Sequence, residues 1–274
     1  MYLGIDIGGT KTLVAQFDNT GVLKASVKFP TPKIYTEFLK ELSIAVASFS
    51  TKKFVAGGVA APGSIDRSHG IAKDFGNLPW HDVPLKKDIE KIVSCPIVVE
   101  NDANLAGLSE AVLLPKYPCV LYVTISTGIG TGIIIDQAID PELADSEGGH
   151  ILLEHKGKLV TWESFASGKA IVQRFGKRAS EISSQHTWNI IARDIALGLY
   201  DLIAFIQPDV VVLGGGVMEH FKKFKADLSE DLQHFQTPLT PIPPIRQAKR
   251  PNEAVVIGCY ELAKRTYGST HPKA

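Results

Sequence analysis

The sequence is poor in cysteine and has no excess of either charge. Its three cysteines, Cys95, Cys119 and Cys259, are too few and too scattered for a disulfide framework or a closed zinc site. The 29 Lys and Arg residues balance the 29 Asp and Glu residues, which gives a formal net charge of zero. Nucleic-acid binders usually carry a basic excess that displaces counterions from phosphates, so we expect no nucleic-acid partner.

Long hydrophobic runs are also missing. The most apolar stretch, Ile190 to Ile206, is interrupted by Arg193, Asp194 and Asp201, which argues against a membrane span. Near the N-terminus, Asp6 interrupts the chain before a signal-like apolar segment can form. Hydrophobic residues still make up 45% of the chain, which is enough for a real core. We therefore expect a soluble, cytoplasmic globular protein with no membrane partner.

Short apolar runs alternate with segments of helical periodicity, which is typical of an α/β fold. Leu3 to Ile7 and Thr12 to Phe17 predict two strands joined by a glycine turn. Val120 to Ser126 and Ile133 to Asp136 repeat the same strand–turn–strand pattern about half a chain later. The repetition predicts a duplicated α/β architecture.

The duplication predicts two lobes. We place the boundary near residue 113, which gives a smaller N-terminal lobe of residues 1–113 and a larger C-terminal lobe of residues 114–274. The last predicted helix, near Glu253 to Arg265, is a candidate to pack back on the first lobe.

Three glycine-rich turns follow predicted strands. They are Gly8-Gly9-Thr10-Lys11, Thr127-Gly128-Ile129-Gly130-Thr131-Gly132 and Gly214-Gly215-Gly216. Glycine exposes successive backbone N–H groups without side chains in the way, and such a concavity favours anionic oxygens. One turn alone is a weak signal, because glycines between strands usually form ordinary hairpins.

The standard nucleotide motifs do not fit these turns. A Walker sequence ending at Gly168-Lys169 would need a glycine where Glu163 stands, and no G-x-G-x-x-G follows the first strand. An acid, Asp6, precedes the first turn instead. It could hold Mg²⁺ or its water shell, since a hard cation prefers carboxylate and phosphate oxygens, or it could merely cap the turn.

A polar cluster, Glu100-Asn101-Asp102-Ala103-Asn104, lies where a predicted strand meets a helix. Helix capping would explain one of these side chains but not all of them. A carboxylate at this place can take the proton of a substrate hydroxyl during phosphoryl transfer.

Polyhydroxy substrates need several donors and acceptors at fixed angles. Five side chains could supply them: Asn101, Asp102, Glu147, His150 and Glu163. The alternatives are a structural role for His150 and a metal site that adds Glu154 and His155. The metal alternative lacks both an H-E-x-x-H motif and a cysteine pair.

Taken in order, these motifs resemble the ROK sugar kinases and repressors, which belong to the actin-like, hexokinase-type ATPase superfamily. The matching pieces span nearly the whole chain: Gly4-Ile-Asp6-Ile-Gly8-Gly9-Thr10-Lys11, Ala61-Pro62-Gly63, Asn77-Leu-Pro-Trp80, Glu100-Asn101-Asp102-Ala-Asn104, Ser126-Thr127-Gly128-Ile-Gly130-Thr-Gly132, Glu147-Gly-Gly-His150 and Leu213-Gly214-Gly215-Gly216. The resemblance implies a two-lobed actin-like (ribonuclease H-like) ATPase fold with duplicated mixed β-sheets flanked by helices.

The resemblance also implies an activity, namely transfer of a phosphoryl group from ATP, with Mg²⁺, to a hexose hydroxyl, in the first place glucose to glucose 6-phosphate. Asp102 matches the catalytic base of the family. The implied sugar contacts are Asn101, Glu147, His150, Glu163, Gly63 and Asn77. The implied phosphate, metal and nucleotide region comprises Asp6, Gly8, Gly9, Thr10, Lys11, Thr127, Gly128, Gly130, Gly214 and Gly215. Similar proteins often form homodimers, so we expect one here.

The sequence departs from the family pattern after His150. Typical members carry a C-x-C-G-x-x-G-C-x-E segment there, and the His joins its cysteines in a structural zinc site. The stretch Ile151 to Glu163 contains no cysteine, although a glutamate stands at its end. We therefore predict no zinc, a loop held by packing, and a His150 that contacts sugar alone.

Other functions remain open at this point. Polyphosphate could replace ATP, because a related branch also lacks the cysteines, and fructose, mannose or an N-acetylhexosamine could replace glucose. A sugar-responsive repressor would carry a helix-turn-helix ahead of the kinase-like body, whereas this chain starts with the first glycine-turn strand. A sugar sensor without activity is disfavoured by Asp102 and the three glycine turns.

Overall fold

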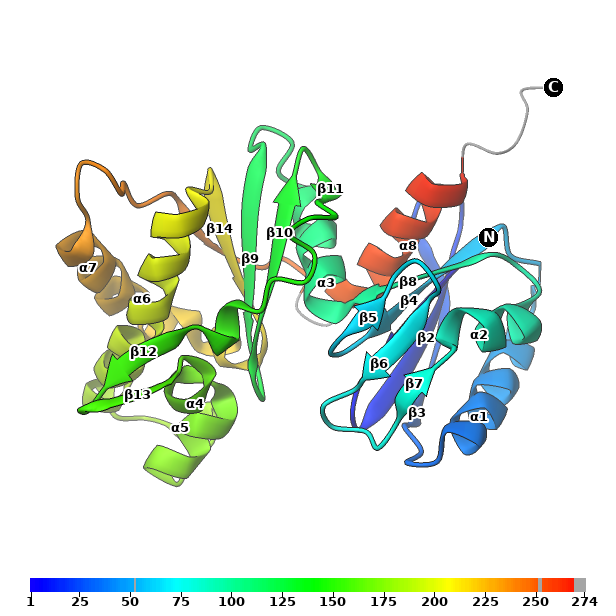
Figure 1. Ribbon diagram of the computed structural model, residues 1–274, viewed down its shortest axis with the longest axis horizontal. Helices are drawn as coiled ribbons and strands as arrows, with labels where there is room; N and C mark the ends of the chain where they lie inside the picture. Colours follow the sequence, from blue (N-terminus) through cyan, green and yellow to red (C-terminus); the bar gives the residue numbers. More distant parts are fainter. Residues whose placement is uncertain (52, 251–252, 269–274) are drawn as a thin grey trace. The chain divides into compact units, whose positions relative to one another are not determined.

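The computed structural model describes residues 1–51, 53–250 and 253–268. The chain divides into two compact units (Figure 1), one of Met1–Ser109 with Asn252–Ala274 and one of Glu110–Pro251. The sequence predicts lobes 1–113 and 114–274, with the last helix as a candidate to pack back on the first lobe; the observed boundary follows Ser109, and the C-terminal helix belongs to the first unit. Helices flank a mixed β-sheet in each unit, so the predicted α/β class is confirmed.

The first unit is built on a five-stranded sheet with the strand order β3-β2-β1-β4-β8. Strand β1 pairs antiparallel with β2 and parallel with β4. The elements of this unit are β1 (Tyr2–Ile7), β2 (Lys11–Phe17), β3 (Leu23–Pro30), α1 (Tyr35–Ala47), β4 (Ala56–Ala61), β5 (Ile65–Asp66), β6 (Ile71–Asp74), β7 (His81–Val83), α2 (Leu85–Val93), β8 (Ile97–Asn101), α3 (Asp102–Ala111, which ends in the second unit) and α8 (Ala254–Tyr267).

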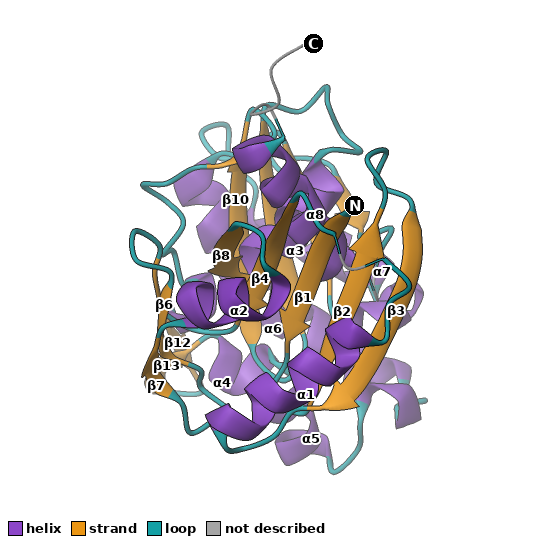
Figure 2. Cartoon of the chain, turned by 90° about the vertical axis from the view of Figure 1, so that its right-hand side faces the viewer, coloured by secondary structure: helices purple, strands orange, loops and turns teal. Residues whose placement is uncertain are grey.

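The two faces of this sheet are covered by different helices. Alternate side chains of β1, such as Leu3 and Ile5, pack in one buried cluster with Phe38 of α1 and Leu85 of α2. Figure 2 shows α1 and α2 in front of this face. The opposite face carries α8, which packs Tyr260 against residues of β1 and β2.

Glycines let α8 lie directly on the sheet and on α3. A Cβ atom at Gly58 would come within 2.3 Å of the Cys259 carbonyl oxygen, and one at Gly4 within 2.8 Å of that of Val256. On α8 itself, a Cβ at Gly258 would come within 2.0 Å of the Leu105 carbonyl oxygen. These tertiary contacts, which span most of the chain, explain why α8 joins the first unit.

The second unit repeats the arrangement with the strand order β11-β10-β9-β14-β15. Strand β9 pairs antiparallel with β10 and parallel with β14, as β1 does with β2 and β4. Its elements are β9 (Cys119–Ile125), β10 (Ile129–Ile135), β11 (Ala138–Ile139), η1 (Gly148–His150), β12 (Leu152–His155), β13 (Lys158–Thr161), α4 (Glu163–Ala166), α5 (Gly168–Phe175), η2 (Ala179–Glu181), α6 (Gln185–Ile206), β14 (Val210–Gly214), η3 (Gly216–Lys223), α7 (Lys225–Phe235) and β15 (Ile245–Gln247).

The core of the second unit lies between its sheet and α6. Trp162 and Trp188 are completely or almost completely buried there, and the indole N–H of Trp162 donates to the Asp194 carbonyl oxygen at 3.0 Å. None of the helices in the described residues is long and apolar enough to cross a membrane.

We expect Gly258→Ala to destabilise the first unit by about 3 kcal/mol, because the new methyl group overlaps the backbone of α3. Chemical denaturation would measure the loss. Gly216→Ala is the control, since a Cβ at Gly216 meets nothing within 4 Å. Equal midpoints for the two variants would contradict the close packing of α8 on α3.

Candidate functional site

Two carboxylates meet at one end of the first sheet. Strand register places Asp6 opposite Ala60, and Ala60 opposite Glu100, so β1, β4 and β8 end side by side. Helix α3 begins at Asp102, directly after β8. The pKa of Asp6 is raised to about 7, mainly by desolvation and secondly by the negative charge of Asp102, while Lys28 acts in the opposite direction.

A cation would relieve this repulsion. Among the residues that the structure describes, no three His, Cys, Asp or Glu side chains are grouped to hold a metal ion. Two neighbouring carboxylates nevertheless fit Mg²⁺, which keeps several waters and takes most remaining ligands from phosphates. Asp6, which has a second carboxylate nearby, therefore suits a magnesium ion that arrives with a phosphate compound.

The first glycine turn lies at the same end of the sheet, between β1 and β2. The Gly8 N–H donates to the Lys11 carbonyl oxygen at 3.0 Å, and the Thr31 hydroxyl donates to the Gly8 carbonyl oxygen at 2.7 Å. The Thr31 N–H donates to the Thr10 carbonyl oxygen at 3.0 Å. Lys11 already belongs to β2, so the turn itself is shorter than predicted.

Asn77 lies against this turn. A Cβ at Gly9 would come within 2.8 Å of the Asn77 Cβ, so a side chain larger than hydrogen would displace the Asn77 loop. The Lys33 ammonium donates to the Asn77 carbonyl oxygen at 3.1 Å. The exposed Asn77 side chain and the first glycine turn are therefore neighbours, although they are nearly seventy positions apart in the sequence.

Asn101 caps α3 and contacts Gly63. Its side-chain oxygen accepts the N–H groups of Ala103 at 2.8 Å and Asn104 at 3.4 Å, while its amide donates to the Gly63 carbonyl oxygen at 3.3 Å. The Asp102 carboxylate accepts the Ala103 N–H at 2.8 Å. Capping thus explains part of the role of Asn101, and the second hydrogen of its amide is available to a ligand.

In the second unit the structure brings Glu147, His150 and Glu163 together. The His150 Nε2 lies 3.6 Å from a Glu163 carboxylate oxygen, and the other oxygen accepts the Ile129 N–H at 3.2 Å. Partial desolvation raises the pKa of Glu147; the charge of His150 lowers it, and that of Glu163 raises it. A Cβ at Gly128 would come within 2.7 Å of Glu163, so these acids lie beside the second glycine turn.

The second glycine turn is shorter than the sequence predicted. Strand β10 begins at Ile129, and Gly130 pairs with Thr124 of β9 inside the ladder. Gly130 is therefore a strand residue and not part of the turn. The turn consists of Ser126, Thr127 and Gly128, because the Ile125–Ile129 pair already closes the hairpin.

Two glycines of the third turn are required by close packing. Gly215 has φ +89°, and its Cβ would come within 2.5 Å of the Ile125 carbonyl oxygen. A Cβ at Gly214 would come within 2.2 Å of the Tyr122 hydroxyl. Glycine therefore lets β14 and the start of η3 pack against β9, whatever ligand the turn contacts.

A cavity of about 470 Å³ opens beside the second and third turns. Its lining residues are Ser126, Thr127, Gly168, Lys169, Val172, Arg178, Ala179, Ser180, Gly216, Val217, Glu219 and His220. The Gly168 N–H donates to the Ser126 carbonyl oxygen at 2.7 Å, which fixes the turn against α5. Two cations and an apolar wall suit a ligand that combines an anionic group with a flat apolar part.

Sequence reasoning missed the cations of this cavity. Lys169 and Arg178 come from α5 and from the residue before η2, and no motif contains both. The Gly168-Lys169 pair could have indicated a phosphate-binding lysine, but it does not fit a Walker motif because Glu163 stands where a glycine is required.

The cysteine-free segment after His150 forms the β12–β13 hairpin and contributes to a buried ion cluster. His155 of β12 lies 3.3 Å from the Asp194 carboxylate of α6, which also accepts from Arg174 at 2.6 Å. The His155 ring stacks on Phe165 with centroids 4.2 Å apart. Burial raises the pKa of Asp194, and Arg174 and His155 act in the opposite direction. Charged contacts as well as packing therefore hold this segment.

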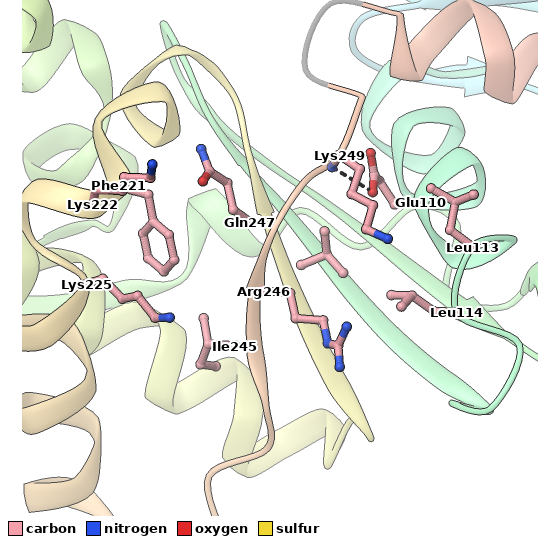
Figure 3. Close-up of a pocket in the computed structure, with 11 residues that line it drawn as sticks. Glu110, Leu113, Leu114, Phe221, Lys222, Lys225, Ile245, Arg246, Gln247 and Lys249 are labelled. Atoms are coloured by element: carbon pink, nitrogen blue, oxygen red, sulfur yellow. Dashed lines mark hydrogen bonds between the residues drawn. The ribbon is translucent and has the colours of Figure 1, made fainter.

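A further cavity of about 310 Å³ lies elsewhere in the second unit (Figure 3). Lys225, Arg246 and Lys249 contribute to its lining, and none of the predicted site residues does. The buried Glu110 carboxylate accepts the N–H groups of Lys249 at 3.0 Å and Arg250 at 2.8 Å. Glu110 thereby fixes the segment that follows β15 to the end of α3.

Comparison with known proteins agrees with the sequence motifs. A family model described as ROK family matches residues 2–266. A glucokinase of Streptomyces coelicolor is 26% identical over 307 aligned residues, which cover 96% of this chain and 97% of that protein. A fructokinase of Streptococcus mutans is 27% identical and covers 97% of this chain and 98% of its own length.

A solved structure agrees with the fold. The crystal structure of a ROK family glucokinase from Streptomyces griseus, in complex with glucose and AMPPNP, superposes with a TM-score of 0.83. It is 26% identical in sequence, and the match covers 96% of this chain and 99% of that one. The predicted actin-like ATPase fold is thereby confirmed.

We expect Asp6→Asn to stabilise the metal-free protein increasingly as the pH rises. The pKa of Asp6 is 3.8 in its unperturbed state and about 7 in the fold, so the folded state binds the extra proton and loses stability between these values. Above pH 7 the ionised form costs on the order of 4 kcal/mol. Chemical denaturation in EDTA at pH 5 and pH 8 measures the difference in unfolding free energy between Asp6→Asn and the wild type. An equal difference at the two pH values would contradict the raised pKa of Asp6.

We expect Asp194→Asn to lower the free energy of unfolding by about 3 kcal/mol, because it leaves Arg174 and His155 without their buried carboxylate. Asp231→Asn, which removes an exposed pair with Arg193 at 2.7 Å, should cost under about 1 kcal/mol. A metal chelator should leave the unfolding midpoint of the wild type unchanged. A lower midpoint with chelator, together with measured zinc, would show that this segment depends on metal.

Proposed function

The chain belongs to the ROK family, and we propose that it is a sugar kinase that transfers the γ-phosphoryl group of ATP to a hexose hydroxyl. One observation carries the proposal. Asp102 lies at the start of α3, beside Asp6 and at the end of the sheet where the first glycine turn presents its backbone. A base, a metal-binding acid and an anion-binding turn are what phosphoryl transfer to an alcohol requires.

Asp102 is the general base in this proposal. Its carboxylate takes the proton of the acceptor hydroxyl as that oxygen attacks the γ-phosphorus, and ADP leaves with the bridging oxygen. The Ala103 N–H bond orients the carboxylate. Mg²⁺, when bound near Asp6, would neutralise charge on the phosphate oxygens. The turn of Gly8, Gly9, Thr10 and Lys11 receives the phosphate groups, with Gly8 shaping the turn because its own N–H is bonded to the Lys11 carbonyl oxygen.

The sugar contacts are proposed to be Asn101, Glu147, His150, Glu163, Gly63 and Asn77. Carboxylates accept from sugar hydroxyls, and the imidazole and amide groups can donate to them. Glucose is the proposed hexose, because the Streptomyces griseus structure is a glucose complex and the Streptomyces coelicolor relative is a glucokinase. The fructokinase relative is equally similar, so a panel of hexoses is part of the test.

The proposed donor is ATP, bound in the cavity of about 470 Å³. Val172 and Val217 offer apolar surface to the base, while Lys169 and Arg178 offer charge to the phosphates. Thr127 and Gly128 of the second turn, with Gly214 and Gly215 of the third, complete the proposed nucleotide region. The AMPPNP complex of the Streptomyces griseus relative supports this choice.

We further propose a cytoplasmic homodimer with neither a nucleic-acid nor a membrane partner. The zero net charge supports the absence of nucleic acid. Phe205 and Leu239, each 87% exposed, are large apolar side chains that a second copy could cover.

Asp102→Asn should lower kcat by about 10²- to 10⁴-fold, because the amide cannot take the proton. The dissociation constant for sugar should stay within about threefold of wild type. Coupled ADP release with ATP-Mg²⁺ and a hexose panel measures kcat, and calorimetry measures sugar binding. Asp82→Asn, at an exposed position in the same unit, is the matched control.

Wild-type turnover in Asp102→Asn would contradict the assigned base. Turnover with polyphosphate but not with ATP would contradict the donor. Fastest turnover on a hexose other than glucose would correct the sugar and leave the chemistry in place.

A further inference from the structure

We propose that Arg67 is a positioning residue for Asp102 and acts through Glu100. The inference rests on the proposed kinase function, in which Asp102 is the base. Nothing in the sequence motifs singles out Arg67, which lies in the turn between β5 and β6, outside the matching segments.

Arg67 and Glu100 form a two-pronged ion pair within the first unit. The Arg67 Nε donates to one Glu100 carboxylate oxygen at 2.8 Å, and Nη2 donates to the other at 2.7 Å. The Glu100 side chain is 7% exposed and that of Arg67 is 26% exposed. Parallel bonds of this kind fix direction as well as distance, which a lysine could not do.

Glu100 in turn accepts hydrogen bonds from residues at the start of α3. The oxygen that accepts from Arg67 Nη2 also accepts the Asn101 N–H at 2.7 Å and the Asn104 side-chain amide at 3.0 Å. Asp102 therefore lies between two residues that Glu100 holds. Without Arg67, the Glu100 carboxylate would lose two of the donors that fix its orientation, so the group that anchors Asn101 and Asn104 would be held less firmly.

Arg67 also connects two sets of proposed substrate contacts. It belongs to the segment β5–β6–β7, which forms a separate three-stranded sheet and carries the Asn77 loop. Gly63 precedes β5, and its carbonyl oxygen accepts from Asn101. The Arg67–Glu100 pair is thus the charged link between the segment with Gly63 and Asn77 and the junction with Asn101 and Asp102.

The pair also balances charge. Glu100 stands two positions before Asp102 and its side chain is 7% exposed, so without a partner it would be a buried charge close to the proposed base along the chain. The Arg67 guanidinium compensates Glu100 directly, so the charge of this junction stays with the two residues that the reaction uses.

The test is a double-mutant comparison of Arg67→Met and Asp102→Asn. In the wild-type background Arg67→Met should lower kcat by about 10- to 100-fold, while the KM for ATP stays within about twofold. In the Asp102→Asn background the same change should lower residual turnover by less than about twofold, because a misplaced amide loses nothing further. Thermal unfolding checks that the variants fold in both backgrounds, and single-turnover measurements at high enzyme concentration give the residual rates.

Two further variants keep the test decisive. Arg67→Lys should recover part of the lost kcat, since it restores the charge but only one donor direction. If Arg67→Met does not fold, the comparison is made with Arg67→Lys in both backgrounds. Arg193→Met removes the exposed pair with Asp231 and should leave kcat unchanged.

Three outcomes would overturn the inference. Wild-type kcat in Arg67→Met, with Asp102→Asn impaired, rejects the role of Arg67 and leaves the proposed function standing. Equal losses in both backgrounds indicate a general structural role and also reject positioning. Wild-type turnover in Asp102→Asn rejects the base and with it the positioning role of Arg67, while the proposed phosphoryl transfer stands.

Discussion

The burial of the Asp6 carboxyl beside the negative charge of Asp102 is the constraint on which the candidate site of the first unit depends. Both residues lie where parallel strands end, Asp6 in β1 and Asp102 directly after β8. Desolvation and, to a smaller extent, Asp102 disfavour the ionised form of Asp6, whereas Lys28 partly offsets this cost. Such stored electrostatic cost is common where a ligand or cation later supplies the missing charge.

The glycine of each turn leaves space for a different neighbouring group. Gly9 leaves room for Asn77, Gly128 for the Glu163 carboxylate, and Gly215 for the backbone of β9. In each case a Cβ would collide with a group from a distant part of the sequence. The same residues that expose backbone N–H groups therefore also bring polar side chains close to the turns.

Backbone pairing and charged contacts hold the cysteine-free segment after His150 in the second unit. The β12–β13 hairpin gives the segment after His150 its own backbone hydrogen bonds, and Asp194 holds it through His155. Arg174 completes the charge balance of that buried carboxylate. His150 lies beside Glu163 at 3.6 Å, and its side chain is exposed.

The sequence by itself indicated the family, through the order of its motifs. It also predicted the duplicated strand–turn–strand pattern and the positions of Asp6 and Asp102, because these follow from local periodicity and from residues adjacent to strands. Only the tertiary structure decided that α8 joins the first unit, that Gly130 lies inside β10, and that Lys169 shares a cavity with the third turn. The ion pair of Arg67 and Glu100, which are 33 positions apart, was likewise visible only in the tertiary structure. Such contacts depend on how separate elements pack, and no local pattern encodes the partner that a side chain finds across the fold.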